Sequence, residues 1–433
     1  MMPVEPEPVA SSESVPLATG APDDTALSAP YRMTPQEIAW GFVTGEPAHI
    51  EGTATGARVA RAGARDPLDV LRAVVARALL RPPCLVEFSG GRDSSLVLAV
   101  ALEVARRESL PLPVAVTFRF PGYPEADESA WQEAVVRHLG VTEWVRLDGV
   151  PSFDLLGPTS TTSLGRTGVV WPPLAHSRGP VLAMARGGSL VTGEGGDEVF
   201  GAGRATPLRQ VLGRMAPLDA RAARHLALAL APRPLRRAGY RRLYRRHLEV
   251  PWLAPGATDE LVSQLAAEAA REPLDQRRAL PRLRLRRSVA LGLATVDALA
   301  AAAGVQCVHP LLDSTFLAAL ARKGGPLGFT GRDAAMAAAA SEVLPRPVLR
   351  RHTKARFNAV AFGPHSRRFA ARWRGEGVCV PGRGGFVVPP GTVDAERLAA
   401  MWAAPEPPAG TFALLQACWL AARPRPTTGI GAP

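Results

Sequence analysis

The sequence predicts an α/β protein, with a doubly wound parallel sheet followed by a mostly helical C-terminal region. Apolar runs of strand length alternate with helix-like runs through about residue 200. Two of the strand-like runs lead directly into loops rich in glycine and acidic residues, 89–95 and 192–201. Beyond about residue 204 the pattern is helical and shows no obvious strand. Such alternation is typical of a parallel sheet with helices on both faces.

The first predicted elements surround the loop at 89–95. Residues 66–80 are expected to form a helix with Asp66 as its N-cap, because proline follows directly and an apolar period begins there. The run 84–88, "CLVEF", reads as a buried strand, and 94–108 as a helix with an apolar face. A strand, a glycine loop and a helix therefore follow one another.

The alternation continues up to the second loop. Gly140 is expected to end the helix before it, because glycine readily takes the left-handed conformation of a helix C-terminus. The predicted elements are a strand at 113–120, a helix at 124–140, a strand at 143–148, an irregular connection at 151–173, a helix at 175–186 and a strand from 189.

Composition divides the chain into three parts. Residues 1–30, rich in proline, serine and alanine, are predicted to form a disordered tail. Residues 31–65 form a short N-terminal remnant, and 66–425 form the main domain. Within that domain we expect the sheet core at about 81–203 and the helical part at about 204–425.

Composition also limits the cellular setting. No uncharged apolar stretch reaches the length of a membrane span, and the acidic N-terminus lacks the basic start and apolar core of a signal peptide. The four cysteines are far apart and show no zinc spacing, so we expect reduced core thiols. These features predict a cytoplasmic protein without a membrane segment.

The net charge is +12 and comes almost entirely from arginine. The arginine-rich run 233–247 could contact nucleic acid, but a solvated helix face is the favoured interpretation, so nucleic acid is not an expected partner. The only lysines are Lys323 and Lys354. Where arginine is the usual cation, a lysine indicates a place that needs a compact, mobile ammonium group.

The first glycine loop, Ser89–Ser95 ("SGGRDSS"), has the composition of a phosphate-binding loop. Glycines let the backbone approach an anion, serine hydroxyls donate hydrogen bonds, and the following helix adds its positive end. No Lys-Ser/Thr pair follows, so the loop is not a Walker A motif. Asp93 would repel a phosphate unless Mg²⁺ lay between them. The candidate binding residues are Ser89, Gly90, Gly91, Ser94 and Ser95.

The second glycine loop, Thr192–Gly201 ("TGEGGDEVFG"), carries acidic groups at the end of a strand. In a doubly wound sheet, ligands bind outside the carboxyl ends of the strands. We therefore expect both loops to face one crevice, in which Asp93 and Asp197 share a magnesium ion. A phosphate and metal site follows from the two loops together.

At this point the chain resembles a known family. "SGGRDSS" is similar to the pyrophosphate loop of the N-type ATP pyrophosphatases, and together with "GEGGDEVFG" it resembles the synthetase domain of the asparagine synthetase family. The stretches 297–313, with "HPLLD", and 344–357, with "TKARF", resemble two further motifs of that family in the same order. The resemblance covers roughly residues 66–425 and implies an adenine nucleotide alpha hydrolase-like sheet.

The resemblance implies roles for individual residues. It gives Asp93 and Asp197 as magnesium ligands, Glu194 as the base that acts on an amine, and Lys354 as the catalytic lysine at the α-phosphate and departing pyrophosphate. The residues implied to hold ATP are Ser89, Gly90, Gly91, Asp93, Ser94 and Ser95 around the pyrophosphate portion, and Phe120, Thr192 and Gly193 around the base and sugar.

The implied reaction has two steps, with ATP and Mg²⁺ as cofactors. A small-molecule or peptide carboxylate attacks the α-phosphorus of ATP to give an acyl-adenylate and pyrophosphate. An amine or ammonia then attacks the activated carbonyl, which yields an amide and AMP. Positive charge from Lys354 and the metal would stabilise the charge that grows in the transition state.

The chain departs from the family at its N-terminus. Full-length asparagine synthetases begin with a glutaminase domain whose nucleophile is a cysteine, and here Met2 stands in that place. About 80 residues precede the first glycine loop, fewer than such a domain needs. We therefore expect no glutaminase in this sequence. The amine is then free ammonia, part of the acceptor itself, or delivered by a separate amine-delivering or precursor-binding protein.

The chain also departs from the family before "HPLLD". Ala298, Gln306 and Val308 stand where the family has Arg, Glu and Arg. A site for a small, doubly charged amino acid needs paired charges, because an unpaired buried charge is costly. We therefore expect that free aspartate is not the acceptor and that a larger carboxylate, on a peptide or a specialised metabolite, suits these residues better.

Two other classes remain open. A tRNA-modifying N-type ATP pyrophosphatase, such as a tRNA lysidine synthetase, would use the arginine load, although "GEGGDE" and "HPLLD" speak against it. A non-catalytic nucleotide-binding relative is the other, against which Asp93, Asp197 and Lys354 argue. Among amide-forming relatives, lasso-peptide cyclases fit better than β-lactam synthetases, which carry tyrosine in place of Glu194.

Overall fold

A computed structural model describes most of the main domain and a short segment before it. The described residues are 32–46, 65–213, 219–340, 343–344, 346–349, 351, 353–382 and 385–423. The predicted tail, 1–30, lies outside them, as does much of the predicted remnant, 31–65. Within the remnant, a short helix α1 (Pro35–Trp40) is closed at its N-terminus by Thr34 and Glu37, each bonding the backbone of the other.

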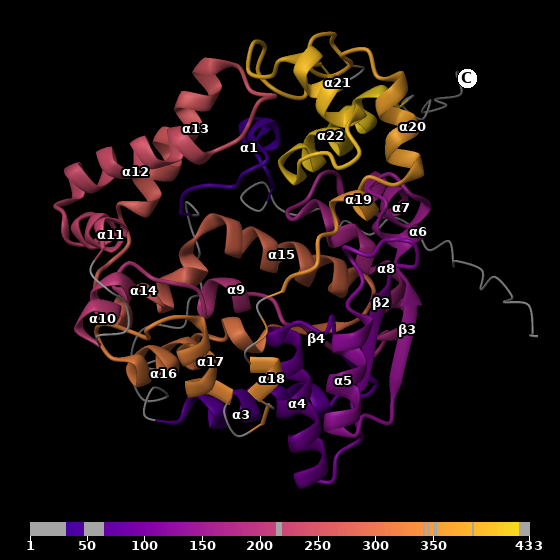
Figure 1. The fold of residues 1–433 in the computed structure, drawn as a ribbon. Coiled ribbons are helices and arrows are strands. Elements are labelled where there is room, and N and C mark those ends of the chain that lie inside the picture. The colour runs from indigo at the N-terminus through magenta and orange to yellow at the C-terminus, as the bar shows by residue number, and fades with distance from the viewer. Residues whose placement is uncertain are drawn as a thin grey trace, which may run out of the picture.

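The chain forms a five-stranded parallel sheet in the order β3-β2-β1-β4-β5. Its edge strand β3 lies at the right of the view in Figure 1, beside β2. The chain runs outward from β1 to β2 and β3, and then returns to place β4 on the other side of β1. The predicted fold class, a doubly wound α/β sheet, is confirmed. The strands are β1 Cys84–Glu87, β2 Val114–Arg119, β3 Trp144–Asp148, β4 Ser189–Val191 and β5 Gln306–Val308.

Helices cover both faces of the sheet. On one face, α3 (Pro67–Leu79) and α4 (Arg92–Arg107) pack with α16 (Ser314–Gly324) against apolar strand residues such as Val86 and Val191. On the other face, α8 (Gly179–Met184) and the end of α15 (Arg287–Ala302) cover Leu85, Val116 and Leu190. Burial on both faces explains why the inner strands β1 and β4 are largely apolar runs.

The reversal of strand order lies between β1 and β4, which pair directly, with Leu85 opposite Leu190. In such sheets the crevice at the reversal, outside the carboxyl ends of the strands, is where ligands bind. The first glycine loop follows β1 and the second follows β4. The fold therefore places the two glycine loops next to each other, as predicted.

The prediction that no strand follows residue 204 is wrong. Gln306–Val308 forms β5, which pairs with β4 so that Cys307 lies opposite Leu190. Three residues are too few to show a strand period, and the hydrogen bonds come from a partner more than a hundred residues earlier. Tertiary pairing therefore decides this element, not its local sequence.

The prediction of an irregular connection at 151–173 is also wrong. This stretch contains α6 (Val150–Phe153) and α7 (Pro158–Thr167). Pro158 stands at the first position of α7, where a proline is well tolerated because that N–H has no partner inside the helix. The threonines that suggested a loop bond back to carbonyls of their own helix, as Thr161 does to Gly157 at 2.9 Å.

Several predicted helix limits shift by a few residues. α4 begins at Arg92 rather than near residue 94, so Asp93 lies in its first turn. α5 (Ser129–Leu139) begins later than predicted and ends, as predicted, at a left-handed Gly140 with φ 58°. The helix predicted at 175–186 is a 3₁₀ turn, η2 (Pro173–Arg178), that continues into α8.

The rest of the chain is helical and forms its own apolar cluster. Trp252, Trp402 and Phe412 are among its buried side chains, and the cluster joins helices from both ends of the described chain (Figure 1). The remaining helices are α9 Gly196–Val199, α10 Thr206–Leu212, α11 Ala220–Leu230, α12 Arg233–His247, α13 Pro255–Ala269, α14 Gln276–Ala279, η3 Pro281–Leu285, η4 Pro310–Leu312, α17 Arg332–Ala340, α18 Arg346–Leu349, α19 Asn358–Ala361, α20 Pro364–Arg372, α21 Ala395–Ala403, η5 Ala409–Thr411 and α22 Phe412–Ala422.

The surface agrees with part of the compositional predictions. In the arginine-rich helix α12 only Arg236 is buried, and the other arginines face solvent. No described helix is long and apolar enough to cross a membrane.

All four cysteines are free thiols, but Cys379 is exposed, so the prediction that all are core thiols is wrong for it.

Candidate active site

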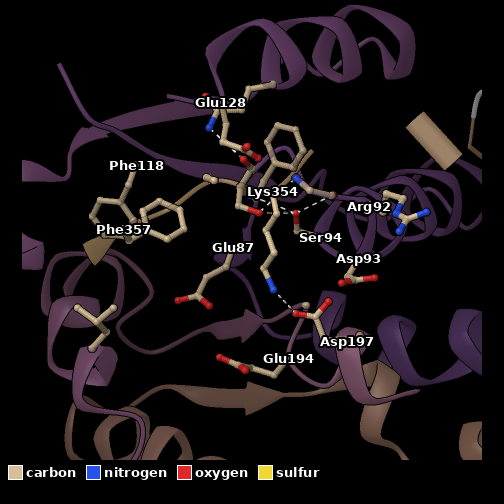
Figure 2. Close-up of a pocket in the computed structure, with 18 of the residues that line it drawn as sticks. Glu87, Arg92, Asp93, Ser94, Phe118, Glu128, Glu194, Asp197, Lys354 and Phe357 are labelled. Carbon is tan, nitrogen blue, oxygen red and sulfur yellow. Dashed lines mark hydrogen bonds and ion pairs between the residues drawn. The ribbon is translucent and has the colours of Figure 1, made fainter. Parts of the chain in front are cut away.

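A cavity of about 740 Å³ opens at the carboxyl ends of β1 and β4. This volume lies in the usual range for small-molecule sites. Both glycine loops line it, together with residues from α17 and from the segment after α18. Figure 2 shows Phe118 and Phe357 on one side of this cavity, and Arg92 with Asp93 on the opposite side.

The first glycine loop holds a compact arrangement of hydroxyls. The Oγ atoms of Ser89 and Ser94 lie 3.1 Å apart, and the Ser89 N–H donates to Ser94 Oγ at 3.2 Å. Gly90 has φ 85°, and a Cβ there would lie 2.8 Å from the Gln132 side chain. Glycine therefore allows both the turn and the close approach of α5.

The second glycine loop packs directly on the first. A Cβ at Gly193 would lie 3.1 Å from the backbone nitrogen of Ser94, and one at Gly196 would lie 2.1 Å from Cγ of Asp93. Only hydrogen fits at Gly196 without moving the Asp93 carboxylate. The glycines of the second loop thus let Asp93 and Asp197 approach the same space.

The "HPLLD" stretch supports the second loop from behind. Gly195 adopts φ 85°, and a Cβ there would lie 2.3 Å from Cγ of Leu312. Asp313 caps α16 by accepting hydrogen bonds from the N–H groups of Thr315 at 2.8 Å and Phe316 at 3.2 Å. The motif therefore holds the loop in place, and its aspartate is a helix cap rather than a cavity residue.

Asp93 and Asp197 converge on one cation, the guanidinium of Arg332. Nη2 donates to both oxygens of Asp93 at 2.8 and 2.6 Å, and Nη1 donates to Oδ1 of Asp197 at 2.7 Å. Burial raises the pKa of Asp93, Arg332 opposes the rise, and the charge of Asp197 adds to it. Burial alone would also raise the pKa of Asp197, but Lys354 and Arg332 outweigh it and lower that pKa.

These two carboxylates fit a magnesium ion. Their oxygens are hard anionic ligands, which Mg²⁺ prefers, and both carboxylates face the same guanidinium and therefore the same space. The serine hydroxyls and backbone of the first loop lie beside them, where phosphate oxygens could complete the coordination. Asp93 and Asp197 are therefore the residues that would hold the metal.

Lys354 reaches into the cavity from the segment after α18. Its Nζ makes an ion pair with Oδ2 of Asp197, as Figure 2 shows. The side chain is otherwise exposed, with 77% of its surface open to solvent. An exposed ammonium on a flexible stem can shift to a ligand without losing buried packing.

Arg351 fixes the segment that carries Lys354. It is 5% exposed and donates to the carbonyl of Gly90 at 2.7 Å. It also pairs with Glu128, and its guanidinium lies 4.9 Å from the ring centre of Trp131. Since Arg351 bonds the first glycine loop and α5 together, it places Lys354 relative to the phosphate-binding loop.

Glu194 is held by a partly buried arginine. Arg178, at the end of η2, pairs with Glu194 and donates to Glu87 at 2.8 and 3.2 Å. Burial alone would lower the pKa of Arg178, but the charges of the two glutamates outweigh it and raise that pKa. This triple places the Glu194 carboxylate at the cavity wall and keeps a fixed positive charge beside it.

The side of the cavity away from Asp93 is aromatic. Phe120 is 6% exposed, and its ring centre lies 4.8 Å from that of Phe153 and 5.3 Å from that of Phe357. Phe120 follows β2 directly instead of ending it. Such a wall suits a flat, apolar ring with its polar edge turned outward.

Three predicted binding residues do not line the cavity. Gly90, Ser95 and Thr192 lie behind its wall, and Ser95 and Thr192 have no exposed surface. Thr192 Oγ1 lies 2.7 Å from Nδ1 of His309, whose Nε2 lies 3.1 Å from Asp297. The threonine hydroxyl is therefore engaged with His309, which follows β5, and not with the cavity.

The other predicted site residues line the cavity together. They are Ser89, Gly91, Asp93, Ser94, Phe120, Gly193, Glu194, Asp197 and Lys354.

Cys307 lies near His309 and Asp297, with their possible ligand atoms within 4.8 Å of one another. Burial raises the pKa of the Cys307 thiol, which favours the neutral thiol over the thiolate that metals bind.

Sequence reasoning missed the arginines of this site. Arg332 and Arg178 belong to no motif, and nothing in the local pattern distinguishes them from the many surface arginines. Ala298, Gln306 and Val308, the replacements that predicted a larger acceptor, do not line the cavity. Their replacement therefore says little about the wall of the cavity.

Comparison with known proteins identifies the family. The family model described as asparagine synthase matches residues 68–419, which is most of the chain. The comparison with curated proteins gives no match. The match covers the sheet, both glycine loops and Lys354, and it supports an ATP-dependent ligase activity. On this match and this geometry, the chain belongs to the asparagine synthase family.

Proposed function

We propose that the protein is an ATP-dependent ligase that forms an amide by way of an acyl-adenylate and releases pyrophosphate and AMP. The observation that carries this proposal is the meeting of both glycine loops and Lys354 at one cavity. A phosphate loop without a Walker lysine, beside a metal-binding pair of aspartates, suits a grip on the β- and γ-phosphates that depart together.

The residues of the cavity divide the first step between them. Ser89, Ser94 and the backbone of the first loop bind the pyrophosphate portion of ATP, and the aromatic wall at Phe120 takes the base. Asp93 and Asp197 would hold a magnesium ion, which would supply positive charge to the phosphate oxygens. Lys354 adds an ammonium group whose stem lets it follow the charge as pyrophosphate departs.

Glu194 performs the proton transfer of the second step. An amine that attacks the acyl carbonyl must lose a proton, and the Glu194 carboxylate lies on the cavity wall where it can accept it. Arg178 holds that carboxylate in position from the buried side. Glu87, which also pairs with Arg178, lies on the same wall. The charges of this pair therefore face the cavity that an incoming amine would enter.

The acceptor we propose is a carboxylate larger than free aspartate, as a small molecule or on a peptide. The support is the size of the cavity, about 740 Å³, which leaves room for a ligand larger than aspartate beside the nucleotide. The nitrogen donor is an amine or ammonia. Robust turnover of aspartate with ammonia would contradict this choice of acceptor.

The test of the proposed reaction is the bond that is cleaved in ATP. The protein is incubated with ATP, Mg²⁺, a panel of carboxylates and hydroxylamine, which traps an acyl-adenylate as a hydroxamate. Phosphorus NMR should show AMP and pyrophosphate in step with hydroxamate. ADP and orthophosphate would overturn the proposal.

A further inference from the structure

The two metal-binding aspartates are already neutralised by the protein itself. Arg332 contacts both oxygens of Asp93 and Oδ1 of Asp197, and Lys354 contacts Oδ2 of Asp197. All four carboxylate oxygens therefore accept a hydrogen bond from a cationic side chain. Two negative charges meet two positive ones, and the place that a metal ion would take holds a guanidinium.

The backbone of Arg332 is held in place, while its guanidinium can still donate a further hydrogen bond. It is the first residue of α17, and this end of the helix is tied to the first glycine loop because Arg92 donates to Asp333 at 2.6 Å and to the carbonyl of Leu349 at 3.0 Å. The guanidinium itself keeps an unused donor, since its buried Nε has no hydrogen-bond partner among the described residues. A buried donor without a partner is costly, so this arrangement leaves binding capacity for another acceptor.

We propose that Arg332 is a resident counter-cation of Asp93 and Asp197, which turns to the phosphate oxygens when metal and nucleotide bind. It follows that the site accepts the metal together with a polyphosphate and resists the free metal ion. This inference rests on the proposed function, because it takes ATP as the ligand that brings the phosphate.

Electrostatics explains both why the site resists the free metal ion and why it accepts the metal together with a polyphosphate. A free divalent ion would have to displace Arg332 and would then leave a half-buried guanidinium and an ammonium facing a dication. Like charges at such distances repel strongly away from bulk water. A pyrophosphate group brings acceptors for both displaced cations, and a planar guanidinium can bind two phosphate oxygens at once. Metal and polyphosphate should therefore bind with strong mutual cooperativity.

The test measures binding and needs no acceptor substrate. Binding of Mn²⁺ to the full chain is followed by electron paramagnetic resonance, first alone and then with inorganic pyrophosphate. The wild type should bind free Mn²⁺ weakly and bind it much more tightly with pyrophosphate. Arg332→Gln should bind free Mn²⁺ about tenfold or more tightly than the wild type, and should bind pyrophosphate with Mn²⁺ about tenfold or more weakly. Arg332→Lys should restore part of both effects.

The matched control is Arg322→Gln, which removes an exposed arginine of α16 whose one side-chain hydrogen bond among the described residues goes to the carbonyl of Arg65. It should match the wild type in both titrations, and thermal melts should show that all variants are folded. If Arg332→Gln binds free Mn²⁺ as weakly as the wild type, or keeps wild-type affinity for pyrophosphate, the inference is wrong while the proposed function stands. If the wild type binds neither pyrophosphate nor ATP with Mn²⁺, both fail.

Discussion

At the scale of single residues, Lys354 is the side chain whose role depends least on packing. It is one of two lysines in a chain with 51 basic residues, and its ammonium pairs with Asp197 at the mouth of the cavity. An arginine at this place would carry the same charge. A compact ammonium differs because it can approach a single phosphate oxygen as charge develops there, which a broad planar fork does less well.

Lys354→Ala should lower pyrophosphate formation by about a hundredfold or more, because it removes a cation that acts in the transition state. Lys354→Arg should also be poor. Since the side chain is exposed, the thermal midpoint should change by no more than about 2 °C. The other lysine provides a matched control, because Lys323 pairs with Asp66 far from the cavity. Lys323→Ala should keep wild-type turnover. Near-normal activity of Lys354→Ala would show that the motif match at this position is misplaced.

At the scale of elements, the glycines of the second loop decide whether the two aspartates can meet. Gly196 begins α9 and lies against the Asp93 carboxylate on α4, the helix that leaves the first loop. The glycine is therefore needed for the approach of a side chain from the other loop. Gly196 is the first residue of a helix and does not have a positive φ. Its backbone conformation is therefore not the reason that glycine is needed here.

Gly196→Ala should abolish binding of Mn²⁺ with pyrophosphate, because a Cβ 2.1 Å from Cγ of Asp93 must push that carboxylate out of place. Gly256→Ala in α13 is the control, since nothing lies within 4 Å of a Cβ there and alanine suits a helix better than glycine. Calorimetric titration compares the two variants. Wild-type binding by Gly196→Ala would contradict the close packing of the two loops.

The predictions from sequence succeeded where local chemistry decides an element and failed where distant contacts do. Asp66 bonds the Leu68 N–H at 3.0 Å as the expected cap of α3, and Gly140 ends α5. β5 was missed because three residues show no period and only pairing with β4 makes them a strand. The helices at 151–173 were missed because threonine hydroxyls can stabilise either a turn or a helix. In α7 they donate to backbone carbonyls of the helix, and the local sequence does not distinguish the two.

At the scale of the whole molecule, chain topology builds the site from three distant segments. The sheet order brings the loops after β1 and β4 together, and this could be predicted because the rule for doubly wound sheets is general. Arg332 lies 239 residues after Asp93 and Arg351 lies 261 residues after Gly90. Spacing alone carries no sign of such contacts, so the cations of the site were found only in the folded chain, apart from Lys354.

The central claim is that the two glycine loops form one site for ATP and its metal. It is tested most directly by crystals grown with Mn²⁺ and α,β-methylene-ATP, in which anomalous scattering locates the manganese. We expect one strong peak about 2.2 Å from carboxylate oxygens of Asp93 and Asp197, with the β- and γ-phosphates on the first glycine loop and Arg332 turned toward them. Manganese away from these two aspartates, or a nucleotide whose phosphates lie outside the Ser89–Ser95 loop, would contradict the claim.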